Sequence, residues 1–593
     1  MISDSVPAQT PSVEPGEGAT TTTRLPRRWL LPVAAAVVLL AAAIGVVAGL
    51  TLNGPRLGGS ATAAGYVPAD ATMYYELRLD LPGDQRANLR TFLGHFPGVD
   101  ADKYLTDEID KQLDAWASKI PGGYLYSADV KPWFDGTLAF ATIGVPSMLG
   151  VGSGDASPAP PQTMVFAGVR DAAGATALSD RLRVEIVKAG GTVTSTTHGS
   201  ATIWSATGLP ATGATSLAKE TFAWTITPDE VIGGTSADLV ATALDIHAGS
   251  KPSLADRQEF RDGLSRLPAN RVLVASVNVA QMLAGAKQEL STLQPGAGNA
   301  LDELLAQSPT YVVTSASVLG DRLSLDASAL MATGATLPAN RDRGLADLAP
   351  GDAIFFDDGA DVGKGLTAYV NAIKKAVATD PQPAQQLQQA EAILGGDLGS
   401  FVSWIGDAAL VAGQTNGQPY AGLIITPTDA GAARTKLAQL RGLLQLAAGV
   451  GTQVSVSDAD HNGTTITTVK VAAGAGTPAW AETYQYAVTN QRVVFGNGET
   501  FVARVLDTDK AHSLGGQARF SGALDAIGGT ANIGTVWLDL AALRAAIEPL
   551  IPAAEQGTYQ SDVRPWVAPF DYVIAANRAD GQLLTSRVAI VVK

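Results

Sequence analysis

The sequence contains an internal repeat, and this repeat limits what the chain can fold into. Residues 222–245 align without a gap on residues 484–507, with apolar residues falling on apolar ones. A shorter match in the same order joins residues 67–71 to residues 349–353. Self-similarity over such a distance predicts that one structural unit is built twice along the chain.

The order of apolar patterns is the same in both halves. Strands joined mostly by hairpins, with helices between them, predict an α+β fold with largely antiparallel sheets. We place two tandem, internally repeated α+β units in residues 66–336 and 337–593. In the first unit the expected strands and hairpins cover residues 73–79, 138–142, 164–169, 192–205, 222–233, 272–279, 311–319 and 322–330, with a helix over 175–189; in the second they cover residues 353–356, 408–412, 420–425, 453–471, 484–496, 533–540, 572–578 and 583–592, with a helix over 431–447.

A long apolar run precedes the repeat. Residues 29–52 hold no charged side chain, and a helix of that length is roughly 36 Å long, enough to cross a hydrocarbon core of about 30 Å. Arg24, Arg27 and Arg28 precede the run and only Arg56 follows it closely. Because basic residues stay on the cytoplasmic side, the run predicts a single-pass transmembrane helix with a cytoplasmic N-terminus.

A cleaved signal peptide is the alternative for this segment. Residues 61–63, Ala-Thr-Ala, have the composition of a cleavage site. A signal peptide, however, has an apolar core of about 7 to 15 residues, which is shorter than the run here. We therefore expect an uncleaved anchor in the cell membrane, with the bulk of the chain outside the cytoplasm.

The flanks of the predicted anchor lack large apolar residues. Residues 1–28 are rich in Pro, Ser and Thr, and residues 53–65 are rich in Gly. Such segments cannot bury enough surface to order themselves. They predict a disordered cytoplasmic tail and a flexible tether.

Charge and cysteine content exclude several functions. The chain has 41 basic and 56 acidic residues, a net charge of −15, which argues against nucleic-acid binding and against electrostatic adhesion to an anionic membrane. It has no cysteine. Disulfides, thiol catalysis, iron–sulfur clusters and thiolate zinc sites are therefore excluded.

One segment resembles a calcium loop. Asp458, Asp460 and Asn462 stand at its first, third and fifth places, with Gly463 at the sixth. The twelfth place, where a bidentate Glu belongs, is Val469. Asn-Gly between two β-rich runs is also a hairpin signal, and we favour the hairpin.

No other motif for catalysis or cofactor binding is intact. The stretch 359–365 is one residue short of a phosphate loop and ends in Gly instead of Ser or Thr. None of the five histidines, His95, His198, His247, His461 and His512, has a metal-ligand spacing. We therefore predict no catalytic, cofactor-binding or metal-binding residue, and a protein that is not an enzyme.

Two residue pairs recur in both halves, which favours structural roles. Asp70 and Asp352 each follow a Pro and are expected to fix a turn into a strand. Trp133 and Trp404 each precede a strand and are expected in the core.

Short motifs also resemble one bacterial family. They are Tyr66-Val-Pro-Ala-Asp70, Leu93-Gly-His-Phe-Pro-Gly98, and Pro132-Trp133-Phe-Asp-Gly136 with its echo Trp404-Ile-Gly-Asp407. With the N-terminal anchor, they make the chain similar to the uncharacterised family called domain of unknown function three-three-five-two. The resemblance implies a membrane-anchored bacterial protein and brings no active-site residue with it.

Three functional hypotheses remain after these exclusions. The first is a binding, scaffold or cell-envelope interaction module with a protein partner in the envelope. The second is a carrier or sensor for an apolar ligand such as a lipid, held between sheet and helices. The third and least favoured is a hydrolase with a site built from loops of both halves.

Overall fold

The computed structural model describes residues 63–118, 122–145, 162–208, 221–293, 302, 306–377, 381–449, 454–471 and 482–593. Leu52–Lys593 form one compact unit. The predicted tail, residues 1–28, the predicted transmembrane helix, residues 29–52, and most of the predicted tether lie outside the described residues. Within the described ranges, no helix has the length and apolar character needed to cross a membrane.

The folded part begins slightly earlier than the sequence indicates. Ala63–Gly65 form a short 3-10 turn, η2, where we expected the end of the tether. Ala63 and Ala64 are fully buried beside Tyr74 in a hydrophobic core. Two methyl side chains fit this site.

In the described residues of the first half there are ten strands, and their order in the sheet differs from their order in the sequence. They are β1 (Met73–Arg78), β2 (Phe134–Ile143), β3 (Gln162–Val169), β4 (Thr192–His198), β5 (Ala201–Thr207), β6 (Phe222–Ile226), β7 (Glu230–Gly234), β8 (Leu273–Val277), β9 (Pro309–Leu319) and β10 (Arg322–Met331). In space the order is β4-β5-β6-β7-β3-β2-β1-β8-β9-β10. Every pair is antiparallel, so the predicted α+β class with antiparallel pairing is confirmed.

The second half follows the same order of pairing. Its strands are β11 (Ala353–Gly359), β12 (Ile405–Thr415), β13 (Gln418–Pro427), β14 (Val454–His461), β15 (Thr464–Val471), β16 (Thr483–Val488), β17 (Val493–Asn497), β18 (Gly534–Asp539), β19 (Phe570–Asp580) and β20 (Leu583–Val592). In space they lie as β14-β15-β16-β17-β13-β12-β11-β18-β19-β20.

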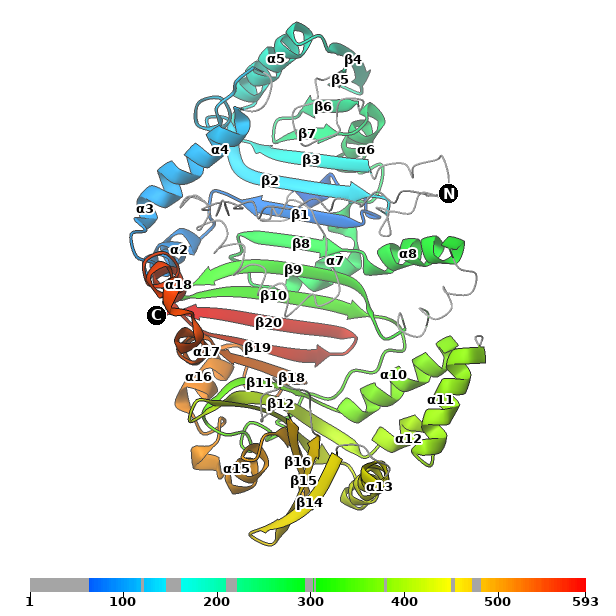
Figure 1. Ribbon diagram of the computed structural model, residues 1–593. Helices are drawn as coiled ribbons and strands as arrows, with labels where there is room; N and C mark the ends of the chain where they lie inside the picture. Colours follow the sequence, from blue (N-terminus) through cyan, green and yellow to red (C-terminus); the bar gives the residue numbers. More distant parts are fainter. Residues whose placement is uncertain are drawn as a thin grey trace, which may run out of the picture. The chain divides into compact units, whose positions relative to one another are not determined.

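The two halves share one sheet. β10 pairs with β20 along its whole length, from Arg322 opposite Val591 to Leu330 opposite Leu583. Figure 1 shows this junction in the middle of the sheet, with β20 next to β10 although most of the second half separates them in sequence. The sheet therefore runs without interruption from β4 to β14.

Helices lie along the margins of the sheet and over parts of both faces. The first half carries α2 (Gln85–Leu93), α3 (Ala101–Lys103), α4 (Ile109–Ala117), α5 (Ala172–Lys188), α6 (Ala237–His247), α7 (Gln258–Ser265) and α8 (Val279–Leu293). The second half carries α10 (Val362–Val377), α11 (Pro381–Ile393), α12 (Leu398–Val402), α13 (Ala430–Gly449), α15 (Phe501–Asp507), α16 (Ala518–Ala526), α17 (Leu540–Ile547), α18 (Ala553–Thr558) and α19 (Arg564–Val567). Short polar side chains start several of them; Ser236, for example, accepts a hydrogen bond from the backbone N–H of Leu239 at the start of α6.

One face of the sheet, called here the covered face, packs against α6, α7, α15 and α16. In the first half Tyr74 meets Phe260 of α7 edge to face, with ring centroids 5.9 Å apart. In the second half Phe356 meets Phe520 of α16 in the same way, at 6.1 Å. Both hydrophobic cores lie on this face.

The opposite face, called here the open face, is covered mainly at its ends. α5 packs over the outer strands of the first half, against Trp133, and α13 packs over those of the second half, against Trp404. Between them Figure 1 looks directly onto the strands, with α2 to α4 and α17 to α18 along one margin and α8 and α10 to α12 along the other.

Candidate functional site

A row of cross-strand partners crosses the open face from one half to the other. Neighbours in an antiparallel register point to the same side of the sheet. The row, called here the central row, consists of Leu138, Leu77, Leu273, Ala316, Leu325, Val588, Ala575, Val536, Asp357, Leu410 and Leu423. All but one of these side chains are aliphatic.

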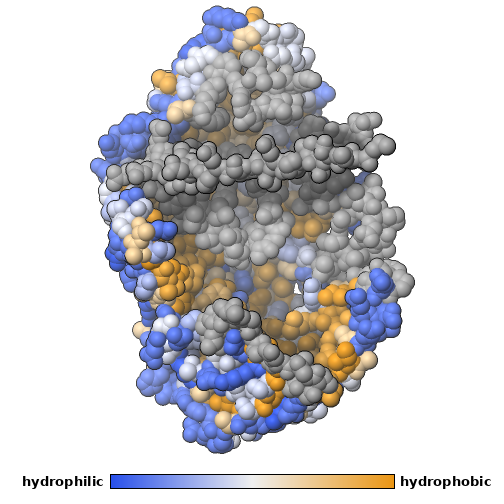
Figure 2. Space-filling model, viewed as in Figure 1, coloured by the Kyte–Doolittle hydropathy of each residue, from blue (hydrophilic) through white to orange (hydrophobic). Residues whose placement is uncertain are grey.

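The central row is exposed unevenly, because Ala316 and Val588 in its middle are each only 4% exposed. Leu410 is 43% exposed and Leu423 nearly as much, and Leu77, Leu273 and Leu325 are partly exposed. In Figure 2 hydrophobic residues gather in the hollow of this face, in the lower half of the view. Exposed apolar side chains that gather on one face are typical of places where a ligand or a partner binds.

The outer end of the open face contains an apolar cavity beneath α5. Its volume is about 210 Å³. Its walls include the side chains of Trp133, Val165, Phe222, Trp224 and Leu182. The indole N–H of Trp224 donates to Ser179 Oγ at 2.8 Å, so the polar atom of this wall is satisfied and the cavity surface is hydrocarbon.

Asp357 is the single ionisable group of the central row. It lies between Leu410 and Val536 in the register. Burial, and the neighbouring charge of Asp358, raise the pKa of its carboxyl above the ordinary value. The row therefore offers a ligand one weak acid within an aliphatic surface.

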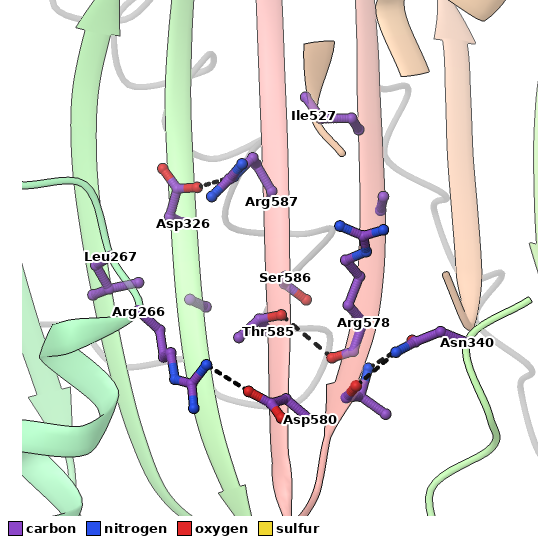
Figure 3. Close-up of a pocket in the computed structure, with 13 residues that line it drawn as sticks. Arg266, Leu267, Asp326, Asn340, Ile527, Arg578, Asp580, Thr585, Ser586 and Arg587 are labelled. Carbon is purple, nitrogen blue, oxygen red and sulfur yellow. Dashed lines mark hydrogen bonds and ion pairs between the residues drawn. The ribbon is translucent and has the colours of Figure 1, made fainter. Parts of the chain in front are cut away.

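A second concave site lies on the covered face, where the halves meet. This polar cleft has a volume of about 430 Å³. It lies beside the β10–β20 junction and is lined by residues of both halves, among them Leu267 after α7 and Ile527 after α16 (Figure 3).

The charges of this polar cleft are mostly satisfied within the protein. Arg587 Nε donates to Asp326 Oδ1 at 2.8 Å, and Arg266 pairs with Asp580 at 2.5 Å (Figure 3). Arg578 donates from Nε and Nη2 to the backbone carbonyl of Ala531 at 3.0 and 2.9 Å. These contacts make the cleft a structural seam between the halves.

A buried acidic cluster lies in the first core and could not be found by motif. Glu76 is fully buried and accepts a hydrogen bond from the hydroxyl of Tyr74. Glu230 is 4% exposed, and its Oε2 has no partner among the described residues. Burial first, then the charges of Asp135 and Glu76, raise the pKa of Glu230 to about 9. The strict alternation of β1 is the one sequence signal that directs Glu76 inward.

The segment that resembles a calcium loop is a hairpin. β14 ends at His461 and β15 begins at Thr464, so Asn462 and Gly463 form the turn. Their φ angles are 52° and 82°, as a type I′ turn requires. Over the residues that the structure describes, no three His, Asp or Glu side chains form a group that could hold a metal ion.

The segment that resembles a phosphate loop does join a strand to a helix. β11 ends at Gly359 and α10 begins at Val362. The carboxylate of Asp407 already accepts the backbone N–H of Asp361 at 2.9 Å, and Arg341 binds both aspartates. The anion position at this turn is therefore filled by side chains of the protein.

The histidines are held at separate places. His198 binds Asp245 at 2.7 Å, and His461 binds Asp507 at 2.8 Å. Each of these pairs joins the tip of an outer hairpin to the end of a helix, at the same place in each half. Recurrence of this kind indicates a structural role.

The remaining histidines also have local partners. His247 stacks on Tyr66 with ring centroids 4.0 Å apart. The ring of His95 contacts the carbonyl of Thr91, and that of His512 contacts Asp509.

Trp133 and Trp404 are buried, as the recurrence predicted. Asp352 differs from the prediction, because its carboxylate accepts the Tyr420 hydroxyl at 3.0 Å and Arg504 Nη2 at 2.6 Å. It joins the start of β11 to its neighbours in the fold through side chains.

Comparison with solved structures and with curated proteins gives no strong match. The solved structures with some likeness include crystal forms III and I of TP0453, at 11% and 8% identity and TM-scores of 0.23 and 0.22. The matches cover 46% and 47% of this chain and 81% and 82% of those chains. TM-scores of this size do not establish a shared fold. No curated protein matches the chain.

A family match covers most of the sequence. Residues 33–573 match the family described as "Protein of unknown function (DUF3352)". This is the family that the motifs around Tyr66 and Trp133 resemble, and that prediction is confirmed. The chain belongs to the DUF3352 family of proteins of unknown function.

Proposed function

We propose that this protein is anchored in the membrane by residues 29–52 and binds the acyl chains of a lipid on its open face. The observation that carries the proposal is the central row. It places aliphatic side chains side by side across both halves and leaves Leu410 and Leu423 substantially exposed. Covering such side chains with hydrocarbon releases about 25 cal/mol per Å² of apolar surface.

The dimensions of the row fit long hydrocarbon ligands. Strands lie about 4.8 Å apart, so the part of the row between β2 and β13 is on the order of 50 Å long. That length accommodates one extended acyl chain or several side by side. The apolar cavity beneath α5 would hold the end of such a chain.

The identical pairing order supports a further part of the proposal, that the halves are two copies of one unit. Neither half alone forms the whole central row, because the row passes through the β10–β20 junction between Leu325 and Val588.

The experiment compares lipid binding by two variants of residues 52–593, which form one compact unit. Native mass spectrometry and titration with the fluorescent fatty acid cis-parinaric acid are the two readouts. Leu410→Asp places a charge in the central row and should weaken binding by about tenfold or more, the partition factor of one buried leucine. Val184→Asp makes the same kind of change on an exposed residue of α5 and should leave binding unchanged. Absence of binding by the unmodified protein refutes the proposal.

One observation favours a second function, binding of a protein partner. Among the described strands, β4 pairs with β5 only, and its sequence Thr-Val-Thr-Ser-Thr-Thr-His carries no Lys, Asp, Glu or Pro. An uncharged edge of this kind accepts a further strand from another chain. Thr194→Pro would remove one backbone N–H from β4. A partner that crosslinks to the unmodified protein in intact cells should then no longer crosslink to the variant.

A further inference from the structure

Both margins of the open face carry exposed apolar side chains in the second half. On α10, Leu366, Tyr369 and Ile373 stand three and then four positions apart, so they lie on one face of the helix. Tyr369 is 56% exposed and its two neighbours are each exposed by more than a third. We call these three residues the α10 stripe.

The other margin carries an apolar turn. α17 ends at Ile547, and the 3-10 turn η8 (Glu548–Leu550) follows it. Leu550 is 77% exposed and Ile547 about half exposed. We call these two residues the α17 turn. Figure 2 shows hydrophobic residues at both margins of the hollow, at the places where Figure 1 draws α10 and α17.

These side chains are displayed on rigid supports. A Cβ at Gly363 of α10 would lie 2.1 Å from the carbonyl oxygen of Ile405, so the helix is seated against β12 with no gap. Glu548 of η8 accepts hydrogen bonds from the Tyr559 hydroxyl at 3.0 Å and from Arg564 Nε at 2.8 Å. Leu550 therefore projects from a fixed turn and does not fold back onto the protein.

Within the described residues, α2, which follows β1 as α10 follows β11, has no such stripe. Phe92 of α2 is buried, and Leu89 and Leu93 pack against the same small core with Phe96. The α10 stripe therefore has no equivalent on α2.

We propose that the α10 stripe and the α17 turn dock on the surface of a lipid bilayer. The inference rests on the proposed function. Docking by both margins would place the open face, where we propose that acyl chains bind, next to the bilayer that supplies them. A single flat apolar partner reaches both margins.

The charges of α10 also fit a bilayer. Its sequence contains Lys364, Lys374 and Lys375 and no acidic residue, in a chain of net charge −15. The side chain of Lys364 is 82% exposed and pairs with Asp361, and Lys374 pairs with Glu391 and Asp397. An amphipathic helix with lysines beside its apolar face is typical of helices that lie in a membrane interface.

The test uses the absence of cysteine, which allows one label at a chosen position. Residues 52–593 are expressed as Tyr369→Cys, Leu550→Cys and, as a matched control, Val187→Cys on α5, which is 58% exposed. Each is labelled with an environment-sensitive nitrobenzoxadiazole dye and mixed with phosphatidylcholine vesicles. We expect a blue shift and a rise in emission at positions 369 and 550 and none at position 187. No shift at 369 and 550, or equal shifts at all three positions, overturns the proposal.

A second measurement separates this proposal from the proposed function. Vesicle cosedimentation measures the binding of the double variant Tyr369→Asp, Leu550→Asp. Binding should fall by about tenfold for each replaced side chain, the partition factor of one buried side chain. The double variant should bind cis-parinaric acid in solution as the unmodified protein does, because neither residue belongs to the central row. Loss of fatty-acid binding in Leu410→Asp with intact vesicle binding shows that docking and ligand binding are separate properties. Unchanged vesicle binding by the double variant overturns the docking surface alone.

Discussion

Glu230 should make the stability of this protein fall as pH rises. The folded chain holds its carboxyl 4% exposed, and burial with the charges of Asp135, Glu76 and Asp229 raises its pKa from 4.5 to about 9. In the unfolded chain the same group ionises near its ordinary value. The folded state therefore keeps a proton that the unfolded state releases.

The sign and size of the effect follow from proton linkage. Because the folded pKa is the higher one, the stabilisation is complete below about pH 4.5 and is lost as pH rises toward about 9. Within that window the loss is about 1.4 kcal/mol per pH unit, so it amounts to roughly 3 kcal/mol at neutral pH as an upper figure. Glu230→Gln keeps the shape and cannot ionise. The free energy of unfolding of this variant should lack that slope.

The measurement is urea unfolding of residues 52–593, followed by tryptophan fluorescence at about pH 5 and about pH 8. The difference between Glu230→Gln and the unmodified chain should grow in favour of the variant by up to about 4 kcal/mol between these two conditions. The change of the unfolding free energy with pH is the decisive quantity, because any packing cost of the amide side chain is the same at about pH 5 and at about pH 8. Glu499→Gln, at an exposed residue paired with Lys470, is the control and should show no such growth. Equal slopes in Glu230→Gln and the unmodified chain refute the assignment.

Three further predictions follow from single contacts. Arg587→Ala leaves the carboxylate of Asp326, which is 3% exposed, without its cation and should cost about 2 to 4 kcal/mol; a double-mutant cycle with Asp326→Ala in urea unfolding should show a coupling energy well above zero. Trp404→Ala removes a buried indole and should cost about 3 to 5 kcal/mol, read as a fall in Tm. Gly463→Val forces a branched side chain into a left-handed turn position, φ 82°, and should destabilise the hairpin by about 1 kcal/mol or more; addition of calcium or of a chelator should leave Tm unchanged in both forms.

Local patterns were sufficient to predict most of the strands. The Asn462-Gly463 turn, with alternating residues on both sides, predicted the β14–β15 hairpin, and the structure has it. The partner of β10 was not predictable. Its pairing with β20 joins residues far apart in sequence, and no local pattern in either strand specifies which strand it pairs with. Helices were expected after the first strand of each half, and α10 to α12 occupy that place in the second half; the expectation gave no bounds for them.

The candidate site left a weaker trace in the sequence. Strand β12 reads Ala-Ala-Leu-Val-Ala around Leu410, apolar on both faces, which is typical of a strand buried on both sides. The structure covers one face and exposes the other, and only the placement of α13 and α15 decides which. Burial of Glu76 has a similar origin, because a single Glu in a short strand gives no sign that a helix will cover it.

The position of β20 in the middle of the sheet has a consequence for how the chain folds. β20 is the last strand in sequence, so the first half is complete, with β10 as a bare edge, long before its partner is synthesised. Asp326 lies in the middle of that edge. If two copies of β10 paired antiparallel, their Asp326 carboxylates would come close together, and this repulsion disfavours self-association of the unpaired edge. Arg587 of β20 then converts the deterrent into an ion pair. Refolding of Asp326→Val at increasing protein concentration should accordingly give more aggregate than refolding of the unmodified chain. Without the Asp326 charge, the β10 edges of two chains could pair before β20 does.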